Sequence, residues 1–342
     1  MGKSAITVAT FNIHAGMDGW GREFDYLKAL SDVSADVTAI QEVFLNKAKY
    51  EQLCSFATSN NINFVVAPLA NAIINNLDAS PVELGGPKSW GPGGRPGRPG
   101  NIRSLYLVEE KGSETDTSAK KIVGFDELLP GEDIGERFDI PHKKGINLRD
   151  VGILSLVLLS KLPIKSYKLY RLAMLRSDRA KRCALVTVIG DGNKEIEVTA
   201  THLGHLTHGS VLQMRQLARV CGQNNLPSVI LGDFNCWGPP LVTLLNHQKP
   251  VLPDLIAEAY PNESRLYQEV VNMTESDLPS GIKTEYKKAH WQRAVLKKSW
   301  PAWRPHSQVD HILVNHLVKE KKPIELTDYG SDHLPLAGQL SY

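Results

Sequence analysis

The chain has 342 residues, of which 42% are hydrophobic and 22% charged, with a formal net charge of +2 at pH 7. This size and composition suffice for a globular core in one or two domains and exclude a disordered or fibrous protein. So mild a charge does not identify a nucleic-acid partner, because the total averages over local patches.

The N-terminal segment alternates strand-like and helix-like patterns. Short apolar runs predict buried strands, and apolar residues at helical spacing predict helices between them. The strands are predicted over residues 5–11, 37–41 and 64–69, and the helices over residues 24–33 and 46–60. Strand, helix and strand in this order are typical of an α/β protein, whose functional loops gather at one edge of a sheet.

The middle of the chain opens with segments that hold few strand or helix signals. Residues 85–100 are so rich in Gly and Pro that we expect a surface loop, and residues 109–149 are interpreted as an insertion over the sheet. Closely spaced strands then follow, which suggests antiparallel neighbours. They are predicted over residues 151–159, 167–175, 182–189 and 195–201.

The C-terminal part adds two helices and two strands to the prediction. The helices are predicted over residues 206–221 and 239–245, and the strands over residues 309–314 and 334–340. We expect one domain over residues 1–342, with loop insertions at about residues 70–103, 109–150 and 246–300.

The stretch P-S-V-I-L-G-D-F-N-C-W, at residues 227–237, joins a buried strand to a polar turn. Gly232 ends the apolar run, and Asp233 and Asn235 follow with one residue between them. In an extended chain both side chains would project from the same face. Acid and amide at a rigid strand end suit a site that orients water, metal or phosphate. An Asx-turn that only closes the strand is the alternative.

Four other strand-like runs carry polar residues of kinds that phosphate chemistry uses, and a fifth cluster precedes the last strand. These residues are Asn12, Gln41 with Glu42, Thr201 with His202, Asp310, and the run Ser331, Asp332 and His333. One such ending is ordinary turn chemistry, but a set distributed over the chain is hard to obtain from turns alone.

Six short motifs follow one another along the chain: T-F-N at 10–12, Q-E at 41–42, T-H-L at 201–203, G-D-F-N at 232–235, V-D-H-I-L-V at 309–314 and S-D-H-L-P at 331–335. In this order they resemble the endonuclease/exonuclease/phosphatase family of metal-dependent phosphohydrolases, which includes deoxyribonuclease, AP endonuclease and neutral sphingomyelinase. The runs H-L-T-H-G-S at 205–210 and W-P-A-W-R-P-H-S-Q at 300–308 resemble an actinobacterial-type branch of that family.

The resemblance implies a fold and an activity. The fold would be α/β, a four-layer α-β-β-α sandwich with two packed, mixed and mainly antiparallel sheets. The activity would be hydrolysis of phosphodiester bonds with a divalent metal cofactor, Mg²⁺ or alternatively Mn²⁺. Phosphoester hydrolysis is among the slowest uncatalysed reactions, so the site must neutralise charge, supply a nucleophile and stabilise a leaving oxygen.

Glu42 is the best candidate for a metal ligand. Mg²⁺ is a hard cation that commonly takes one or two carboxylates and keeps several waters. On the resemblance, Asn12 and Asp332 would complete or support the metal shell. A solvated strand end without a metal is the alternative interpretation of Glu42.

His333 and Asp310 form a second unit that the resemblance implies. Asp310 could accept a hydrogen bond from one ring nitrogen, fix the tautomer and raise the basicity of the other nitrogen. We assign activation of the nucleophile to this pair, with Asp233 and Asn235 orienting water or phosphate. Asp233 is the rival base.

Several other histidines are candidates for the site. His202 would donate to a phosphate oxygen as charge develops. His205 and His208 raise the question of zinc, but the spacing crosses a loop-to-helix junction and lacks a fourth ligand, so helix-start roles are preferred. His14 is a further candidate for substrate binding, whereas His311 alternates away from the site and is expected to pack against the neighbouring layer.

The basic, aromatic stretch over residues 287–304 is the best local sign of a nucleic-acid partner. Cations bind phosphates and indoles stack on bases, so Trp303 and Arg304 are assigned to substrate binding. An amphipathic surface helix and an anionic lipid surface are the alternatives for the same composition.

The leading hypothesis is therefore a metal-dependent nuclease that acts on DNA or RNA. The same site could serve a phospholipid, an inositol phosphate or a small nucleotide, and a non-catalytic binding module on the same fold is the third hypothesis. The silent module is disfavoured because the expected active-site residues are all present: Glu42, His202, Asp233, Asn235, Asp310 and His333.

The sequence also predicts where the protein resides. The four cysteines show no C-x-x-C spacing, so reduced thiols are expected rather than disulfides or zinc ligands. The N-terminus lacks a signal-peptide pattern, and no run approaches the roughly 18 apolar residues of a membrane span. We expect a cytoplasmic monomer with no stable membrane insertion.

Overall fold

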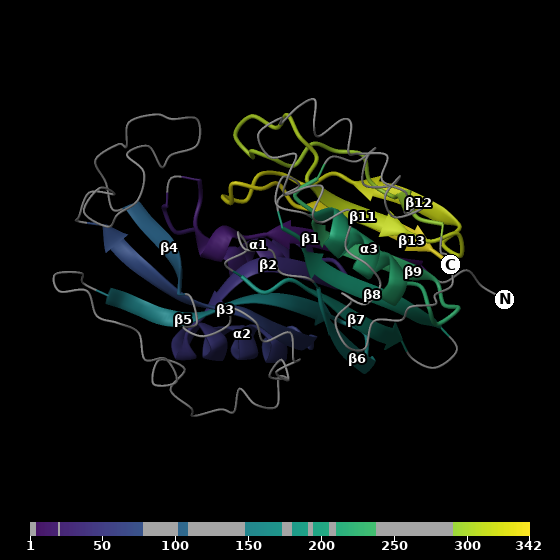
Figure 1. The fold of residues 1–342 in the computed structure, drawn as a ribbon, viewed down its shortest axis with the longest axis horizontal. Helices are drawn as coiled ribbons and strands as arrows, with labels where there is room; N and C mark the ends of the chain where they lie inside the picture. The colour runs from purple at the N-terminus through teal and green to yellow at the C-terminus, as the bar shows by residue number, and fades with distance from the viewer. Residues whose placement is uncertain are drawn as a thin grey trace.

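The structure, a computed structural model, describes residues 5–19, 21–77, 102–108, 148–172, 180–190, 194–204, 210–236 and 290–342. Within these ranges two β-sheets pack face to face, and helices cover their outer faces (Figure 1). The predicted elements over residues 85–100, 109–147 and 239–245 lie outside the described residues, as do His205 and His208. One domain over residues 1–342 stays a prediction.

The first sheet has seven strands in the order β12-β13-β1-β2-β5-β3-β4. The bounds of its strands are β1 (Ala5–Asn12), β2 (Val37–Leu45), β3 (Asn63–Leu77), β4 (Ile102–Val108), β5 (Leu148–Ser160), β12 (Glu320–Ile324) and β13 (Leu336–Ser341). The pair β1 and β2 is parallel, and its other neighbours are antiparallel.

The second sheet has six strands in the order β10-β11-β9-β8-β7-β6. Its strands are β6 (Ile164–Arg171), β7 (Cys183–Gly190), β8 (Glu195–His202), β9 (Ser228–Asp233), β10 (Gln292–Arg293) and β11 (Asp310–Val314). Here β8 and β9 are parallel and the remaining pairs antiparallel. Both sheets are therefore mixed and mainly antiparallel, as predicted.

The helices begin where the sequence provides capping residues. The Asp25 side chain accepts from the backbone N–H of Lys28 at 2.9 Å before α1 (Tyr26–Val33), and Asn46 accepts from Lys49 at 2.9 Å before α2 (Lys47–Ser59). A short 3₁₀ turn, η1 (His14–Gly16), and the helix α3 (Ser210–Val220) complete the set. No helix in the described part of the chain is long and apolar enough to cross a membrane.

Three apolar layers hold these elements together. Side chains such as Val8 of the first sheet and Leu231 of the second fill the space between the sheets. The outer face of the first sheet packs against Leu30 of α1 and Leu53 of α2. Leu217 of α3 packs on the outer face of the second sheet, along which α3 runs beside β8 and β9 (Figure 1). The order helix, sheet, sheet, helix confirms the predicted four-layer sandwich.

Several boundaries differ from the prediction. Residues 70–77, expected to open a loop insertion, continue β3, and residues 102–103 begin β4. Residues 148–150 begin β5, and β10 lies inside the third expected insertion. Strand β12 was not predicted, because its sequence E-K-K-P-I has no apolar alternation; its proline is tolerated at the edge of the sheet.

The strand 151–159 was expected to neighbour the strand that follows it, and this expectation is wrong. The observed β5 pairs with β2 and β3 in the first sheet, whereas β6 pairs with β7 in the second. The chain therefore passes from one sheet to the other between them. Local turn residues mark that a strand ends, but they do not say which sheet the next strand joins.

The register of the strands brings the predicted polar residues to one end of both sheets. In the first sheet Asn12 lies opposite Gln41. In the second, Asp233 lies between His202 on one side and Asp310 on the other. An interaction of Asn12 Nδ2 with Asp233 Oδ2 at 3.1 Å then joins the two sheets at this end.

Gly232 permits the close approach of β8 and β9 just before Asp233. A Cβ atom at Gly232 would lie 2.1 Å from the carbonyl oxygen of Thr201. We therefore expect Gly232→Ala to lower the free energy of unfolding by at least about 2 kcal/mol, through overpacking. Urea unfolding measures this loss.

Gly338 provides the matched control, since it is also a strand glycine. A Cβ there would meet a methyl group of Val295 at 3.2 Å, and this side chain can adjust. Gly338→Ala should cost less than about 1 kcal/mol. Equal losses of stability in the two variants would show that the close approach of the Thr201 carbonyl is not what disfavours a side chain at position 232.

Candidate active site

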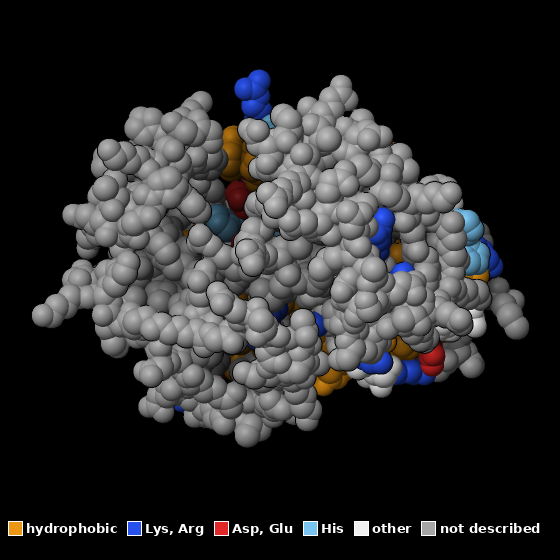
Figure 2. All heavy atoms as spheres, in the orientation of Figure 1, with side chains coloured by type: hydrophobic (Ala, Val, Ile, Leu, Met, Phe, Trp, Pro, Cys, Tyr) orange, Lys and Arg blue, Asp and Glu red, His pale blue; other side chains and the backbone are white. Residues whose placement is uncertain are grey.

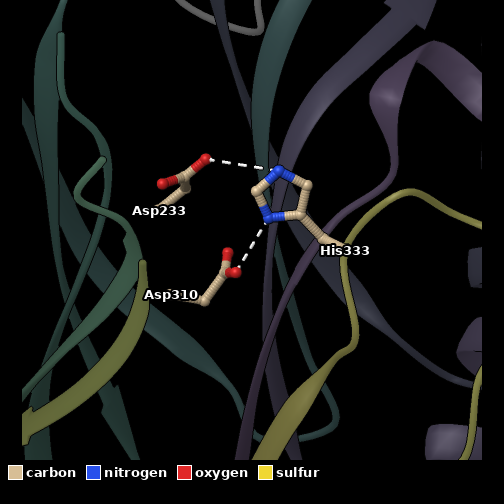
Figure 3. A group of neighbouring side chains, drawn as sticks. All are labelled: Asp233, Asp310 and His333. Carbon is tan, nitrogen blue, oxygen red and sulfur yellow. Dashed lines mark hydrogen bonds and ion pairs between the residues drawn. The ribbon is translucent and has the colours of Figure 1, made fainter. Parts of the chain in front are cut away.

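A short, buried polar contact at this end of the sheets joins His333 to Asp310. Nδ1 of His333 lies 2.8 Å from Oδ2 of Asp310 (Figure 3). Asp310 opens β11 of the second sheet and is fully buried, whereas His333 lies in the loop before β13 of the first sheet. The predicted pair is thus formed by two elements that belong to different sheets.

Asp233 lies on the other side of the His333 ring. Its Oδ2 is 3.9 Å from Nε2 of His333 (Figure 3). This distance is too long for a direct hydrogen bond, but one oxygen atom lying to the side of the two atoms could accept from Nε2 and donate to Oδ2. The carboxylate is fixed by two donors, because Asn12 Nδ2 donates to Oδ2 at 3.1 Å and the Asn235 N–H donates to Oδ1 at 2.8 Å.

The two groups that face each other have strongly shifted pKa values. Burial, together with the charge of Asp310, raises the pKa of Asp233 to about 7. Burial opposes protonation of His333, but the carboxylates of Asp310, Asp233 and Asp332 outweigh it and raise its pKa to about 10. The shifts favour the charged form of His333 and the protonated form of Asp233.

Glu42 reaches the site from an irregular point in β2. The register between β2 and β5 shifts between Ile40 and Val43, and Glu42 has a φ of 56°. Such a bulge redirects one side chain out of the regular alternation of the strand. The Glu42 carboxylate accepts from Asn12 Nδ2 at 3.3 Å and is 22% exposed, so a solvated cation can reach it.

Asp332 and His14 lie at the open side of the site. Nδ1 of His14 is 3.6 Å from Oδ1 of Asp332, and these side chains are 35% and 18% exposed. The backbone N–H of His14 donates to Oδ1 of Asn12 at 3.0 Å, which fixes the amide of Asn12. Asn12 therefore orients Glu42 and Asp233 through its Nδ2 atom.

His202 and Asn235 complete the group. Nε2 of His202 lies 3.8 Å from Oε1 of Glu42 and 3.7 Å from Oδ2 of Asp233. Asn235 Nδ2 donates to the Leu203 carbonyl at 3.0 Å and lies 3.3 Å from Nε2 of His202. Burial, Arg182 and His333 hold the pKa of His202 well below its ordinary value, so the ring is neutral. Donation from His202 to phosphate stays a prediction.

His311 points away from the site, as predicted. It is fully buried, its ring meets the Phe234 ring edge-on with centroids 5.6 Å apart, and its Nε2 donates to the Cys236 carbonyl at 2.8 Å. The histidine thereby holds the turn that follows Asp233.

The basic stretch is not the helix that we considered. Among its residues from 290 onwards the structure has β10 and irregular segments, and Trp291 is buried in the core beneath α3. Nζ of Lys297 donates to Oε2 of Glu325 and to the Leu326 carbonyl, each at 3.0 Å. Trp303 and Arg304 are exposed on a loop beside Asp332.

The face in Figure 2 is hollowed where acidic and histidine side chains gather, with hydrophobic side chains at the rim. Asp233, Asp310 and His333 are the described residues whose ligand atoms all lie within 4.8 Å of one another. Nδ1 of His333 is bonded to Asp310, so only its Nε2 atom could contact a cation held by this group.

The model of the Endonuclease/Exonuclease/phosphatase family matches residues 9–333. The chain belongs to this family. Its members are hydrolases that act on phosphoester bonds, and they generally depend on a divalent metal. The predicted resemblance to the family is confirmed over nearly the whole chain, and the actinobacterial-type branch stays a prediction. No curated protein matches the chain in sequence.

Solved structures of similar fold have very different sequences. One is ANGEL2, a 2',3'-cyclic phosphatase, in complex with adenosine-2',3'-vanadate; it is 13% identical over 99% of this chain and 96% of its own, with a TM-score of 0.55. Another is an endonuclease/exonuclease/phosphatase family protein from Leptotrichia buccalis, 11% identical over 98% of this chain and 100% of its own, with a TM-score of 0.49. At 13% identity the likeness to ANGEL2 shows the fold alone.

The residues around Glu42 fit the divalent metal that the endonuclease/exonuclease/phosphatase family uses. Glu42 and Asp332 carry hard carboxylate oxygens that remain partly exposed, and such oxygens suit a hard divalent cation that keeps several waters. Asn12 fixes the Glu42 carboxylate from behind, as outer partners do in metal sites.

Three residues that hold the site had no predicted role. The buried Ser299 hydroxyl accepts from the N–H groups of Val309 and Asp310, and the Ser331 hydroxyl donates to the Asn12 carbonyl at 2.7 Å. Arg182 acts through its charge on His202. Ser331 belongs to a quoted motif, whereas no local pattern distinguishes Ser299 or Arg182.

His311 should make the stability of the protein depend on pH. Burial lowers its pKa to about 4 from 6.5, so the unfolded state takes up the proton first as the pH falls. The stability contributed by the neutral ring is complete above pH 6.5 and is lost between pH 6.5 and 4, by about 3 kcal/mol. Urea unfolding at several pH values measures this loss.

The control is His311→Phe, which keeps a ring beside Phe234 and cannot titrate. Between pH 6.5 and 4 this variant should lose about 3 kcal/mol less stability than the natural protein. If the two proteins lose the same amount, His311 is not held neutral in the folded state.

Proposed function

We propose that this protein is a divalent-metal-dependent phosphodiesterase, and that its substrate is DNA or RNA. One observation carries the proposal: Asp310, His333 and Asp233 form a buried row, with a gap of 3.9 Å between the last two. A cation and a proton acceptor that face the same small space are what attack of water on a phosphate requires.

His333 binds the phosphate in this proposal. Its Nε2 points into the gap while Asp310 holds Nδ1, so the charged ring can donate to a phosphate oxygen as negative charge develops. Asp310 is a positioning residue that keeps the proton on Nδ1. The hypothesis from the sequence assigns activation of the nucleophile to this pair instead; the raised pKa of His333 favours phosphate binding over proton acceptance.

Asp233 accepts the proton of the attacking water. A pKa of about 7 suits a general base that works near neutral pH. Asn12 and the backbone of Asn235 bind its two oxygens, so the carboxylate cannot rotate. The side chain of Asn235, held by the Leu203 carbonyl, faces the same space and orients water or phosphate.

Glu42 would hold the metal ion, with Asn12 and Asp332 supporting it. Mg²⁺, or alternatively Mn²⁺, supplies positive charge to a phosphate oxygen when bound. His202 contacts Glu42 and Asp233 and would complete the contacts to phosphate. His14, Trp303 and Arg304, all at the open side, would bind the substrate beyond the reacting group.

Hydrolysis tests the proposal directly. A chromogenic phosphodiester, plasmid DNA, RNA, a 2',3'-cyclic nucleotide and a sphingomyelin dispersion are each incubated with Mg²⁺, Mn²⁺ or excess chelator. We expect metal-dependent cleavage of the nucleic acids and of the small diester. Cleavage of sphingomyelin alone or of the cyclic nucleotide alone would refute the proposed substrate, and the absence of any metal-dependent cleavage would refute the proposed enzyme.

His333→Ala and Asp310→Asn should both reduce kcat. Loss of the His333 cation is expected to cost about 10³-fold or more, and loss of the Asp310 charge about 10²-fold or more. Turnover of the small diester measures both effects, and a melting curve for each variant separates them from unfolding. Natural rates in a folded His333→Ala protein would refute the mechanism.

Glu42→Ala should raise the concentration of Mg²⁺ needed for half-maximal activity at least about tenfold, because the main carboxylate ligand is lost. Glu325→Ala is the control, since this side chain is 85% exposed and bonds Lys297. Metal titrations of the two variants make the comparison. Unchanged metal dependence of Glu42→Ala would place the ion elsewhere.

A further inference from the structure

Exposed hydrophobic side chains concentrate on one short segment beside the site. In the described part of the chain the exposed large hydrophobic side chains are those of Tyr167, Leu296, Trp300 and Trp303. Three of these four lie within residues 296–303. Exposed apolar side chains that are close together, rather than scattered, are typical of a surface that binds a ligand or another macromolecule.

The loop over residues 299–307 is braced by its own backbone. The N–H groups of Ser299 and Trp300 donate to the Ser307 carbonyl at 2.9 and 3.0 Å, and Ser307 donates back to Trp300 at 3.0 Å. Arg304 donates to the Pro301 carbonyl at 3.1 Å, which closes the turn. The two tryptophans are therefore carried on a framework that is ordered before any ligand binds, so little entropy is lost on binding.

Hydrogen bonds join the same loop to Asp310 and to the two residues that flank His333. The N–H of Ala302 donates to the Asp332 carbonyl at 2.7 Å, and the Ser299 carbonyl accepts from Leu334 at 2.7 Å. The Ser299 hydroxyl also accepts from the N–H of Asp310 at 3.2 Å. Trp303 directly follows Ala302, and His333 directly follows Asp332. The hydrogen bond between Ala302 and Asp332 therefore holds the backbone of Trp303 close to that of His333. These hydrogen bonds place the backbone of the loop beside that of the site.

The chemistry of the loop matches that of a nucleotide. Trp300 and Trp303 are 36% and 40% exposed, so each indole is partly covered by the protein and offers the remainder to a ligand. The exposed side chains of Lys298 and Arg304 add positive charge beside them. Indoles stack on bases and cations contact phosphates, which together bind one strand of a polynucleotide.

On the basis of the proposed function, we infer that the loop over residues 299–307 is a stacking platform that selects single-stranded nucleic acid. In a duplex the faces of the bases are already stacked on one another. An indole can therefore stack on a base only if the strands separate. An unpaired strand presents its bases at no such cost. The preferred substrate is then single-stranded DNA or RNA, with a base on Trp303 next to the reacting phosphate.

Binding measurements with excess chelator test this inference without turnover. Fluorescence anisotropy compares a labelled single strand of about 12 nucleotides with the duplex of the same sequence. The natural protein should bind the single strand at least about tenfold more tightly. Trp303→Leu should weaken that binding roughly tenfold to a hundredfold, and Trp303→Phe, which retains a ring, should restore most of it. Tyr167→Leu, an exposed aromatic on the edge strand β6, is the control.

The outcomes separate the inference from the proposed function. Unchanged binding in Trp303→Leu, or equal weakening on single strand and duplex, would overturn the stacking platform. Binding to anionic phospholipid vesicles is measured for the same proteins. If Trp303→Leu loses vesicle binding but binds the oligonucleotide as the natural protein does, the stacking platform is overturned in favour of a membrane surface. The proposed function fails separately, if the natural protein shows no metal-dependent hydrolysis of the small diester, of DNA or of RNA.

Discussion

The hydrogen bond between Nδ1 of His333 and Oδ2 of Asp310 joins the two sheets at the end where the site lies. Asp310 belongs to a strand of the second sheet, and His333 precedes a strand of the first. The contact of Asn12 with Asp233 makes the same connection beside it. Packing of the sheets thus determines the distance between the cation and the proton acceptor, so the fold itself sets the geometry on which the proposed chemistry depends.

Backbone conformations at the site are unusual for the same reason. Glu42, Asn235 and His14 have φ values of 56°, 49° and 44°, in the left-handed region that residues other than glycine rarely occupy. Each such backbone conformation lowers the stability of the fold by on the order of 1–3 kcal/mol, and it persists only where surrounding contacts enforce it. Here Asn12 binds Glu42 and the His14 N–H, and Asp233 binds the Asn235 N–H. These hydrogen bonds therefore offset the conformational strain of Glu42, Asn235 and His14.

Local patterns in the sequence predicted the strands and the polar residues at their ends, because burial and turn chemistry leave marks on a few neighbouring residues. They could not show that β2 carries a bulge at Glu42, or that β5 and β6 join different sheets, since both depend on distant partners. Composition also could not separate the buried Trp291 from the exposed Trp303. Nor could it reveal Ser299, whose role arises only when its loop meets β11.

The charge of His333 is the most direct test of how this site would work. Nitrogen-15 NMR of its ring at pH 8 with Mg²⁺, assigned by comparison with His333→Gln, reports whether each nitrogen carries a proton. We expect both to be protonated, because the pKa of His333 is raised to about 10. A neutral ring at pH 8 would contradict the division of roles and would return proton acceptance from Asp233 to His333.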